Sequence, residues 1–205
     1  MSDVSKKSES SRVLRKSPRT MHVFTDGACF ANGSDKAVAG YGVHFPHEEY
    51  DDLAEHFPYK PATNQRAELY AIYHALTIGL HDDMVDDVFV YSDSEYSIKC
   101  ITKWAPGWHK AKWTRKTGGP LKNLDIIKPL YRLYSYNRDR VHFVHVRAHT
   151  GGTDDWSIGN DKADKLAGKG ALSTMSKEDR EAYLASLGPS KSTKNRHRKK
   201  RKRNE

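Results

Sequence analysis

Apolar and polar positions along the chain follow two different periods, and the switches between them predict the secondary structure. Three early segments are short, rich in β-branched or aromatic residues, and bounded by polar or glycine-containing turns. These predicted strands are Met21–Ala28, Ala37–Phe45 and Leu53–Tyr59. The Asn-Gly and Gly-rich turns between them favour an antiparallel meander.

The next segment changes to a helical period. Leu69, Ile72, Leu76 and Leu80 recur at three- and four-residue steps, which predicts an amphipathic helix capped by Thr63 or Asn64. The later predicted elements are strand Val88–Tyr91, helix Ser94–Trp104, helix Leu124–Tyr136, strand Val141–Val146, and helices Asn160–Ala171 and Ser176–Leu187. The order βββαβα, a basic loop, then αβα predicts an α/β fold with helices over a mixed sheet. The strand after the first helix should be parallel to its neighbour.

Charge is concentrated at the two ends of the chain. The net charge is +9, but residues 1–20 hold six Lys/Arg against two acids, and residues 191–205 hold nine against one. We expect disordered basic tails at 1–20 and 189–205, a folded body at 21–173 and a C-terminal helix at 174–188. The tails indicate a polyanionic partner. The body is left with a net charge of −3, for which a cluster of metal-binding carboxylates is one explanation.

Cysteine usage and hydropathy exclude several classes of protein. Cys29 and Cys100 have no CxxC spacing, so we expect two reduced, packed thiols in an intracellular protein rather than a disulfide framework. No stretch approaches the roughly 20 apolar residues of a membrane span. The N-terminus lacks the apolar region of a secretory signal, and a mitochondrial transit peptide is only weakly supported.

Five acids stand where a charge needs an explanation. Asp26 lies in an apolar strand and Asp93 just after another, and a buried charge is costly unless it is paired or metal-bound. Glu68 lies on a partly inward face of the first helix, and Asp161 and Asp164 share one face of a later helix. Each acid can also be explained without a metal. The two Asp residues near strand ends suit turns or helix caps, Glu68 suits the N-terminal end of a helix dipole, and the last two acids suit a solvated helix face. The residues alone therefore indicate no more than a hard-metal site built from oxygen ligands.

Five local motifs go further, because together they resemble the type 1 ribonuclease H family. In that family's order they read FTDGACFANG, TNQRAEL, YSDSEY, VRAHTG and GNDKADKLA, spread over residues 23–167. The resemblance implies the ribonuclease H-like fold, a five-stranded mixed sheet with antiparallel first three strands and helices on both faces. It also implies an endoribonuclease that cuts the RNA strand of RNA–DNA hybrids.

The resemblance assigns roles by position. Four carboxylates match the catalytic metal ligands, namely Asp26, Glu68, Asp93 and Asp164. Asp164 rather than Asp161 matches the fourth ligand, and His149 matches a mobile-loop histidine that assists water activation or product release. The implied chemistry is hydrolysis with two Mg²⁺ ions, for which Mn²⁺ can substitute, leaving 5′-phosphate and 3′-hydroxyl ends.

Further positions match the family's contacts to the hybrid. Asn32, Asn64 and Gln65 match hybrid-contacting residues, although Asn32 also suits a turn and Asn64 a helix cap. Thr63 and Asn123 match the pocket for a phosphate of the DNA strand. These short polar groups suit the reading of 2′-hydroxyls, which distinguish RNA from DNA.

A basic, tryptophan-rich segment matches the protrusion of cellular members of the family. Trp104, Trp108 and Trp113 alternate with Lys and Arg between Lys103 and Lys116. Such a pattern indicates a stacking and phosphate-tracking surface for the DNA strand, with core packing as the alternative for Trp104. It favours a cellular-type, self-sufficient enzyme.

The chain departs from the family pattern in two places. Pro61, with Lys60 beside it, replaces the usual arginine of the phosphate pocket. The segment between His149 and Asp164 is longer than in common members and carries Trp156.

No separate N-terminal hybrid-binding domain is evident, so the basic tails are expected to supply salt-sensitive affinity for nucleic acid. The run RHRKKRKR fits a nuclear-localisation signal equally well, which leaves the nucleus or the cytoplasm as the compartment. We expect a monomer. The alternatives are a non-catalytic hybrid-binding module, or another nuclease on the same fold such as a resolvase or transposase domain. Retention of all four carboxylates disfavours the first, and TNQRAEL with the tryptophan-rich segment disfavours the second.

Overall fold

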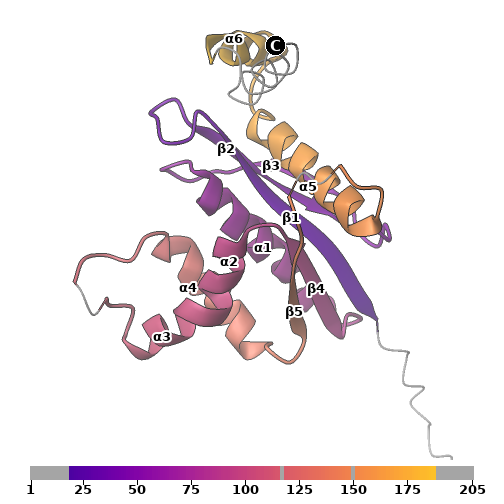
Figure 1. Cartoon of the computed structure of the whole chain (residues 1–205), viewed down its shortest axis with the longest axis vertical. Coiled ribbons are helices and arrows are strands. Elements are labelled where there is room, and N and C mark those ends of the chain that lie inside the picture. The colour runs from indigo at the N-terminus through magenta and orange to yellow at the C-terminus, as the bar shows by residue number, and fades with distance from the viewer. Residues whose placement is uncertain (1–18, 116–117, 149–150, 188–205) are drawn as a thin grey trace, which may run out of the picture.

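A computed structural model describes residues 19–115, 118–148 and 151–187. A five-stranded sheet forms its centre, in the order β3-β2-β1-β4-β5 (Figure 1). Its strands are β1 Thr20–Phe30, β2 Val38–His44, β3 Leu53–His56, β4 Asp87–Ser92 and β5 Val141–His145. The first three strands pair antiparallel, whereas β1 with β4 and β4 with β5 pair parallel. The predicted fold class is confirmed.

Helices cover both faces of the sheet. They are α1 Asn64–His81, α2 Glu95–Lys99, the π-helical η1 Cys100–Trp104, α3 Ala105–Lys110, α4 Leu124–Tyr136, α5 Asp155–Ala171 and α6 Lys177–Ser186. Figure 1 shows α5 on one side of the sheet and α1, α2 and α4 on the other. Helix α5 contacts β1, β2 and β3, while α1 contacts β1, β2 and β4. None of these described helices is long and apolar enough to cross a membrane.

The main hydrophobic core lies between the sheet and α1. Val23 of β1 and Val90 of β4 are completely buried there, and so are Leu69, Ile72 and Leu76 of α1. Burial of each such side chain contributes about 1.5–3 kcal/mol relative to exposure. The helical period read from the sequence therefore marks the buried face of α1.

Glycines allow two helices to touch the sheet backbone. A Cβ added to Gly27 of β1 would lie 2.2 Å from the backbone nitrogen of Glu68. A Cβ added to Gly42 of β2 would lie 2.2 Å from the carbonyl oxygen of Ala163 in α5. Both contacts bring polar residues of a helix close to β1, where Asp26 lies.

Most boundaries differ from the prediction by one or two residues, and two differ by more. Strand β3 ends at His56 rather than Tyr59, because Pro58 has no N–H to donate to a ladder. Helix α5 begins at Asp155 rather than Asn160, because Asp154 caps it by accepting a hydrogen bond from the backbone N–H of Ser157 at 3.0 Å. The additional segment before Asp164 is therefore helical in its second half.

The segment predicted as a basic loop begins with a helix. Pro106 occupies the first turn of α3, where a missing N–H costs nothing. Before it, the predicted helix Ser94–Trp104 changes to a π-turn, in which the N–H of Ala105 donates to the carbonyl of Cys100, five residues earlier. Of the two candidate caps for α1, Thr63 is the N-cap and accepts from the N–H of Arg66.

Candidate active site

Four acidic side chains from four elements line one cavity of about 460 Å³, which we call the carboxylate cavity. They are Asp26 of β1, Glu68 of α1, Asp93 after β4 and Asp164 of α5. Asp161 lies outside that lining. In the described part of the chain no group of three or more His, Cys, Asp or Glu side chains forms a ready metal-binding cluster. An open set of oxygen donors is the arrangement that Mg²⁺ favours, because it keeps water and substrate oxygens as ligands.

Neighbouring polar side chains orient two of the acids. Glu68 accepts hydrogen bonds from the Ser94 hydroxyl and, at 2.7 Å, from the side-chain amide of Asn64. Asp93 accepts one from the side-chain amide of Asn160 at 3.2 Å. Asn160 is 1% exposed, and its Oδ1 has no hydrogen-bond partner in the structure. These bonds fix the carboxylates in rotamers that face the cavity.

Burial and the crowding of negative charge raise the pKa values of two acids in the cavity. Burial raises the pKa of Asp26 to about 8, and the charges of Asp93, Asp164 and Glu68 add to that effect. The N–H of Gly27 donates to Asp26 at 2.7 Å and opposes the shift. Burial also raises the pKa of Glu68. The like charges are costly together, so a divalent cation at this point would be strongly favoured.

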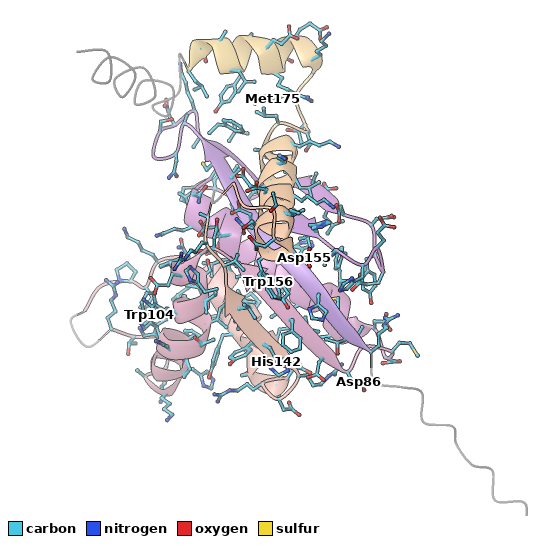
Figure 2. The ribbon with its side chains drawn as sticks, turned by 45° about the vertical axis from the view of Figure 1, so that its right-hand side comes forward. Asp86, Trp104, His142, Asp155, Trp156 and Met175 are labelled. Atoms are coloured by element: carbon cyan, nitrogen blue, oxygen red, sulfur yellow. The ribbon has the colours of Figure 1, made fainter. Side chains whose placement is uncertain are left out.

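A second hollow of about 870 Å³, which we call the tryptophan groove, lies on the other side of the first turn of α1. Its lining includes Gln65, Tyr96, Trp104, Trp108, Arg115 and Lys122. The rings of Trp104 and Trp108 lie 6.1 Å apart, and Figure 2 shows Trp104 on the arm formed by η1 and α3. Aromatic faces and cations are thus combined along one surface.

The structure separates one tryptophan from the other two. The Trp113 ring lies 5.8 Å from that of Tyr131 on α4, and the Lys128 ammonium lies over it at 5.7 Å. Trp113 is half-buried there and is not part of the lining of the tryptophan groove.

The remaining predicted contacts lie around the two hollows. Asn32 is exposed, and its side chain accepts a hydrogen bond from the N–H of Asn64 at 3.4 Å. Asn123 precedes α4 with φ of +60° and donates to the Tyr96 hydroxyl at 3.2 Å. Lys60 donates to the carbonyl of Ala37 at 3.3 Å. His149 lies outside the described residues.

Sequence reasoning missed the residues that orient the acids. Ser94 was predicted as the first residue of a helix; in the structure it caps α2 and also donates to Glu68. Asn160 precedes Asp164 by one helical turn, so the shared face was visible in the spacing. The close approach between Gly27 and the backbone of Glu68 has no sign in the sequence other than the glycine itself.

Comparisons with known proteins agree on one family. The RNase H family model matches residues 18–172. The chain is 42% identical over 147 residues to a probable ribonuclease H of Acanthamoeba polyphaga mimivirus, covering 69% of this chain and 62% of that protein. It is 39% identical over 150 residues to a ribonuclease H of Schizosaccharomyces pombe, covering 73% and 52%. The chain thus spans less than two thirds of these two relatives. For ribonuclease HI of Haemophilus influenzae, the identity is 31% over 154 residues, covering 75% and 91%.

Solved structures give the same fold. The solution structure of the PFV RNase H domain matches with a TM-score of 0.59 and 27% identity, covering 75% of this chain and 94% of that one. The crystal structure of LC9-RNase H1, described as a type 1 RNase H with the type 2 active-site motif, matches with a TM-score of 0.58 over 77% of this chain and 74% of its own. Its identity of 24% supports the fold alone.

Proposed function

Because the chain belongs to the RNase H family, we propose that it is a ribonuclease H that hydrolyses the RNA strand of RNA–DNA hybrids at the carboxylate cavity. The observation that carries the proposal is the convergence of Asp26, Glu68, Asp93 and Asp164 from four separate elements. Acids brought together from such distant parts of the chain repel one another, and a cation-dependent reaction explains why they are retained.

The donor set fits Mg²⁺, with Mn²⁺ as a substitute. All four proposed ligands are carboxylates, and burial together with the neighbouring negative charges raises the pKa of Asp26; a cation would neutralise those charges. Two bound ions would supply activation of water and stabilisation of the leaving oxygen, which yields 5′-phosphate and 3′-hydroxyl ends. The protein itself orients the ligands, through Ser94 and Asn64 on Glu68 and through Asn160 on Asp93.

Residues around the cavity would bind the two strands. Asn32 and Asn64 lie beside it, where their amides can recognise 2′-hydroxyls of the RNA strand. Gln65, the next residue, lines the tryptophan groove, so α1 would touch both strands. In this groove Trp104 and Trp108 would track the DNA strand.

Two parts of the proposal rest on the sequence, and the oligomeric state rests on the cavity. His149 would assist water activation or product release, as the family resemblance implies. The basic run at 189–205 would bind nucleic-acid backbones without sequence preference or direct the protein to the nucleus. A monomer would suffice, because every acid of the cavity comes from one chain.

A cleavage assay tests the proposal directly. Labelled RNA–DNA, RNA–RNA and DNA–DNA duplexes of one sequence are incubated with Mg²⁺, and we expect only the RNA strand of the hybrid to be cut. Asp93→Asn should lower the rate by more than the roughly 10–100-fold typical of residues that merely support a ligand. Cleavage of all three duplexes would refute the substrate assignment, and full activity of the variant would refute the site.

A further inference from the structure

Trp156, on the first turn of α5, packs against core aromatic rings and yet remains half exposed to solvent. Its ring lies 4.7 Å from that of Tyr91 and 6.4 Å from that of Phe24, which belong to the small core cluster under α5. The residue is nevertheless 50% exposed. Figure 2 shows it beside Asp155 at the start of α5, away from Trp104. A rigid aromatic ring with a free surface is a ready stacking platform.

A groove of about 430 Å³ opens beside this ring. Its lining includes Val144, His145, Arg147, Asp154 and Ser157 together with Trp156. The volume falls in the range of about 300–1,000 Å³ that small-molecule sites occupy.

The groove offers positive charge next to the aromatic ring. His145 and Arg147 are both exposed, so a guanidinium and an imidazole are accessible from solvent. Asp154 is the acid in the lining, and both of its oxygens accept hydrogen bonds from Ser157, at 3.0 and 2.7 Å. That carboxylate therefore caps α5, and Arg147 is the side chain of the lining that can pair with an anion.

The groove and the carboxylate cavity have no lining residue in common, but a contact and a helix connect them. The His145 side chain lies 3.2 Å from the backbone carbonyl of Asp93. Trp156, Asn160 and Asp164 follow one another at four-residue steps on one face of α5, so Trp156 lies about 12 Å along the helix from Asp164. Three to four stacked nucleotides at about 3.4 Å each cover that length.

We propose that this groove is a subsite for an unpaired nucleotide of the RNA strand, whose base stacks on Trp156 and whose phosphate contacts Arg147. The inference rests on the proposed function, because it takes the strand being cut as the ligand. The nucleotide must be unpaired, since a base inside a duplex has both faces covered by its neighbours. Trp156 belongs to the additional segment between His149 and Asp164, so the subsite is a property of this chain rather than of the family pattern.

The experiment compares hybrids with an identical duplex, either blunt or carrying a four-nucleotide single-stranded RNA extension at one end. Both 5′ and 3′ extensions are made, each with a fluorescent 2-aminopurine base, and binding is measured without divalent metal. We expect one extension to improve binding about 10-fold, with quenching of its fluorescence. Trp156→Ala should abolish this advantage and leave binding of the blunt hybrid unchanged, while Trp156→Phe should retain most of it.

Ile158→Ala is the matched control, because Ile158 is also exposed on α5, at 43%, but does not line the groove. It should leave the extension advantage intact. Equal weakening of blunt and extended hybrids by Trp156→Ala, with a lower Tm, would overturn the subsite and leave Trp156 as a cover for Phe24 and Tyr91. No advantage for either extension in the wild-type protein would overturn it as well.

The same hybrids with Mg²⁺ separate the two proposals. Cleavage of both blunt and extended hybrids without any effect of Trp156→Ala would refute the subsite and keep the proposed function. Extension binding that depends on Trp156, without cleavage of any hybrid, would support the subsite and refute the proposed function.

Discussion

The carboxylate cavity and the tryptophan groove meet at the first turn of α1, yet they are built in opposite ways. The cavity draws its acids from β1, α1, the end of β4 and α5, and each position depends on long-range packing. The groove is made mostly from one continuous stretch between Tyr96 and Lys122, with Gln65 as the contribution of α1. The comparison suggests that changes in the cavity should alter chemistry and stability, whereas changes in the groove should alter affinity alone.

The largest expected effect separates two acids on one helix. Asp164→Asn should lower the cleavage rate by more than about 100-fold, because Asp164 lines the cavity as a proposed metal ligand. Asp161→Asn should change it by no more than a few-fold, because Asp161 lies outside the lining. Single-turnover kinetics with Mg²⁺ measure both rates. If Asp161→Asn is the more damaging variant, the assignment of the fourth ligand is wrong.

A second effect concerns the stability of the metal-free protein. The pKa of Asp26 rises from 3.8 to about 8 on folding, so the folded state retains a proton that the unfolded state releases as the pH increases from about 4 to about 8. This residue therefore lowers the stability progressively across that window. Asp26→Asn removes the penalty and should stabilise the protein at pH 8 in EDTA by on the order of 2–4 kcal/mol.

Thermal unfolding at pH 4.5 and pH 8, with EDTA or with Mg²⁺, measures this difference. The gain should shrink at pH 4.5, where the wild-type carboxyl is protonated in the folded state. It should also shrink with Mg²⁺, which stabilises only the wild-type cavity by binding to it. An equal gain under all conditions would indicate a packing effect in place of a charge effect.

The smallest effect belongs to the tryptophan groove. Trp108→Ala should weaken hybrid binding about 5- to 10-fold, and Lys122→Ala should reduce the slope of log affinity against log salt by about one. Saturating cleavage rates should be unchanged in both variants. Trp113→Ala is a useful contrast, because its packing against Tyr131 predicts a lower Tm with little change in the salt slope. A large fall in the saturating cleavage rate of Trp108→Ala would contradict the conclusion that the groove affects affinity alone.

Sequence periodicity was sufficient for the order of elements and for the buried face of α1, since both depend on local alternation. Resemblance, and not periodicity, selected Asp164 over Asp161. The structure adds that Asp164 lines the cavity with Asp26, Glu68 and Asp93. The roles of these residues await the cleavage experiments.

Features that depend on contacts between distant segments could not be read from the sequence. Nothing in the local pattern shows that Gly27 lies against the backbone of Glu68, or that Asn160 donates to Asp93. The basic segment was predicted as a loop, although Pro106 is favourable at the start of α3. The early start of α5 had a visible signal in the spacing of Asp154 and Ser157, which form a cap.

The π-turn at Cys100–Trp104 has a consequence for how this arm tolerates insertions and deletions. Because the N–H of Ala105 reaches back five residues to Cys100, the turn contains one residue more than an α-helix would. Deleting one residue within this turn would restore α-helical bonding and leave the helix beyond it in nearly the same orientation, because the N–H of Ala105 would then donate to a carbonyl four residues earlier. Trp108 would keep its place in the groove. A deletion at Gly107 within α3 would instead rotate Trp108 by about 100°, so the arm should tolerate the first deletion better than the second.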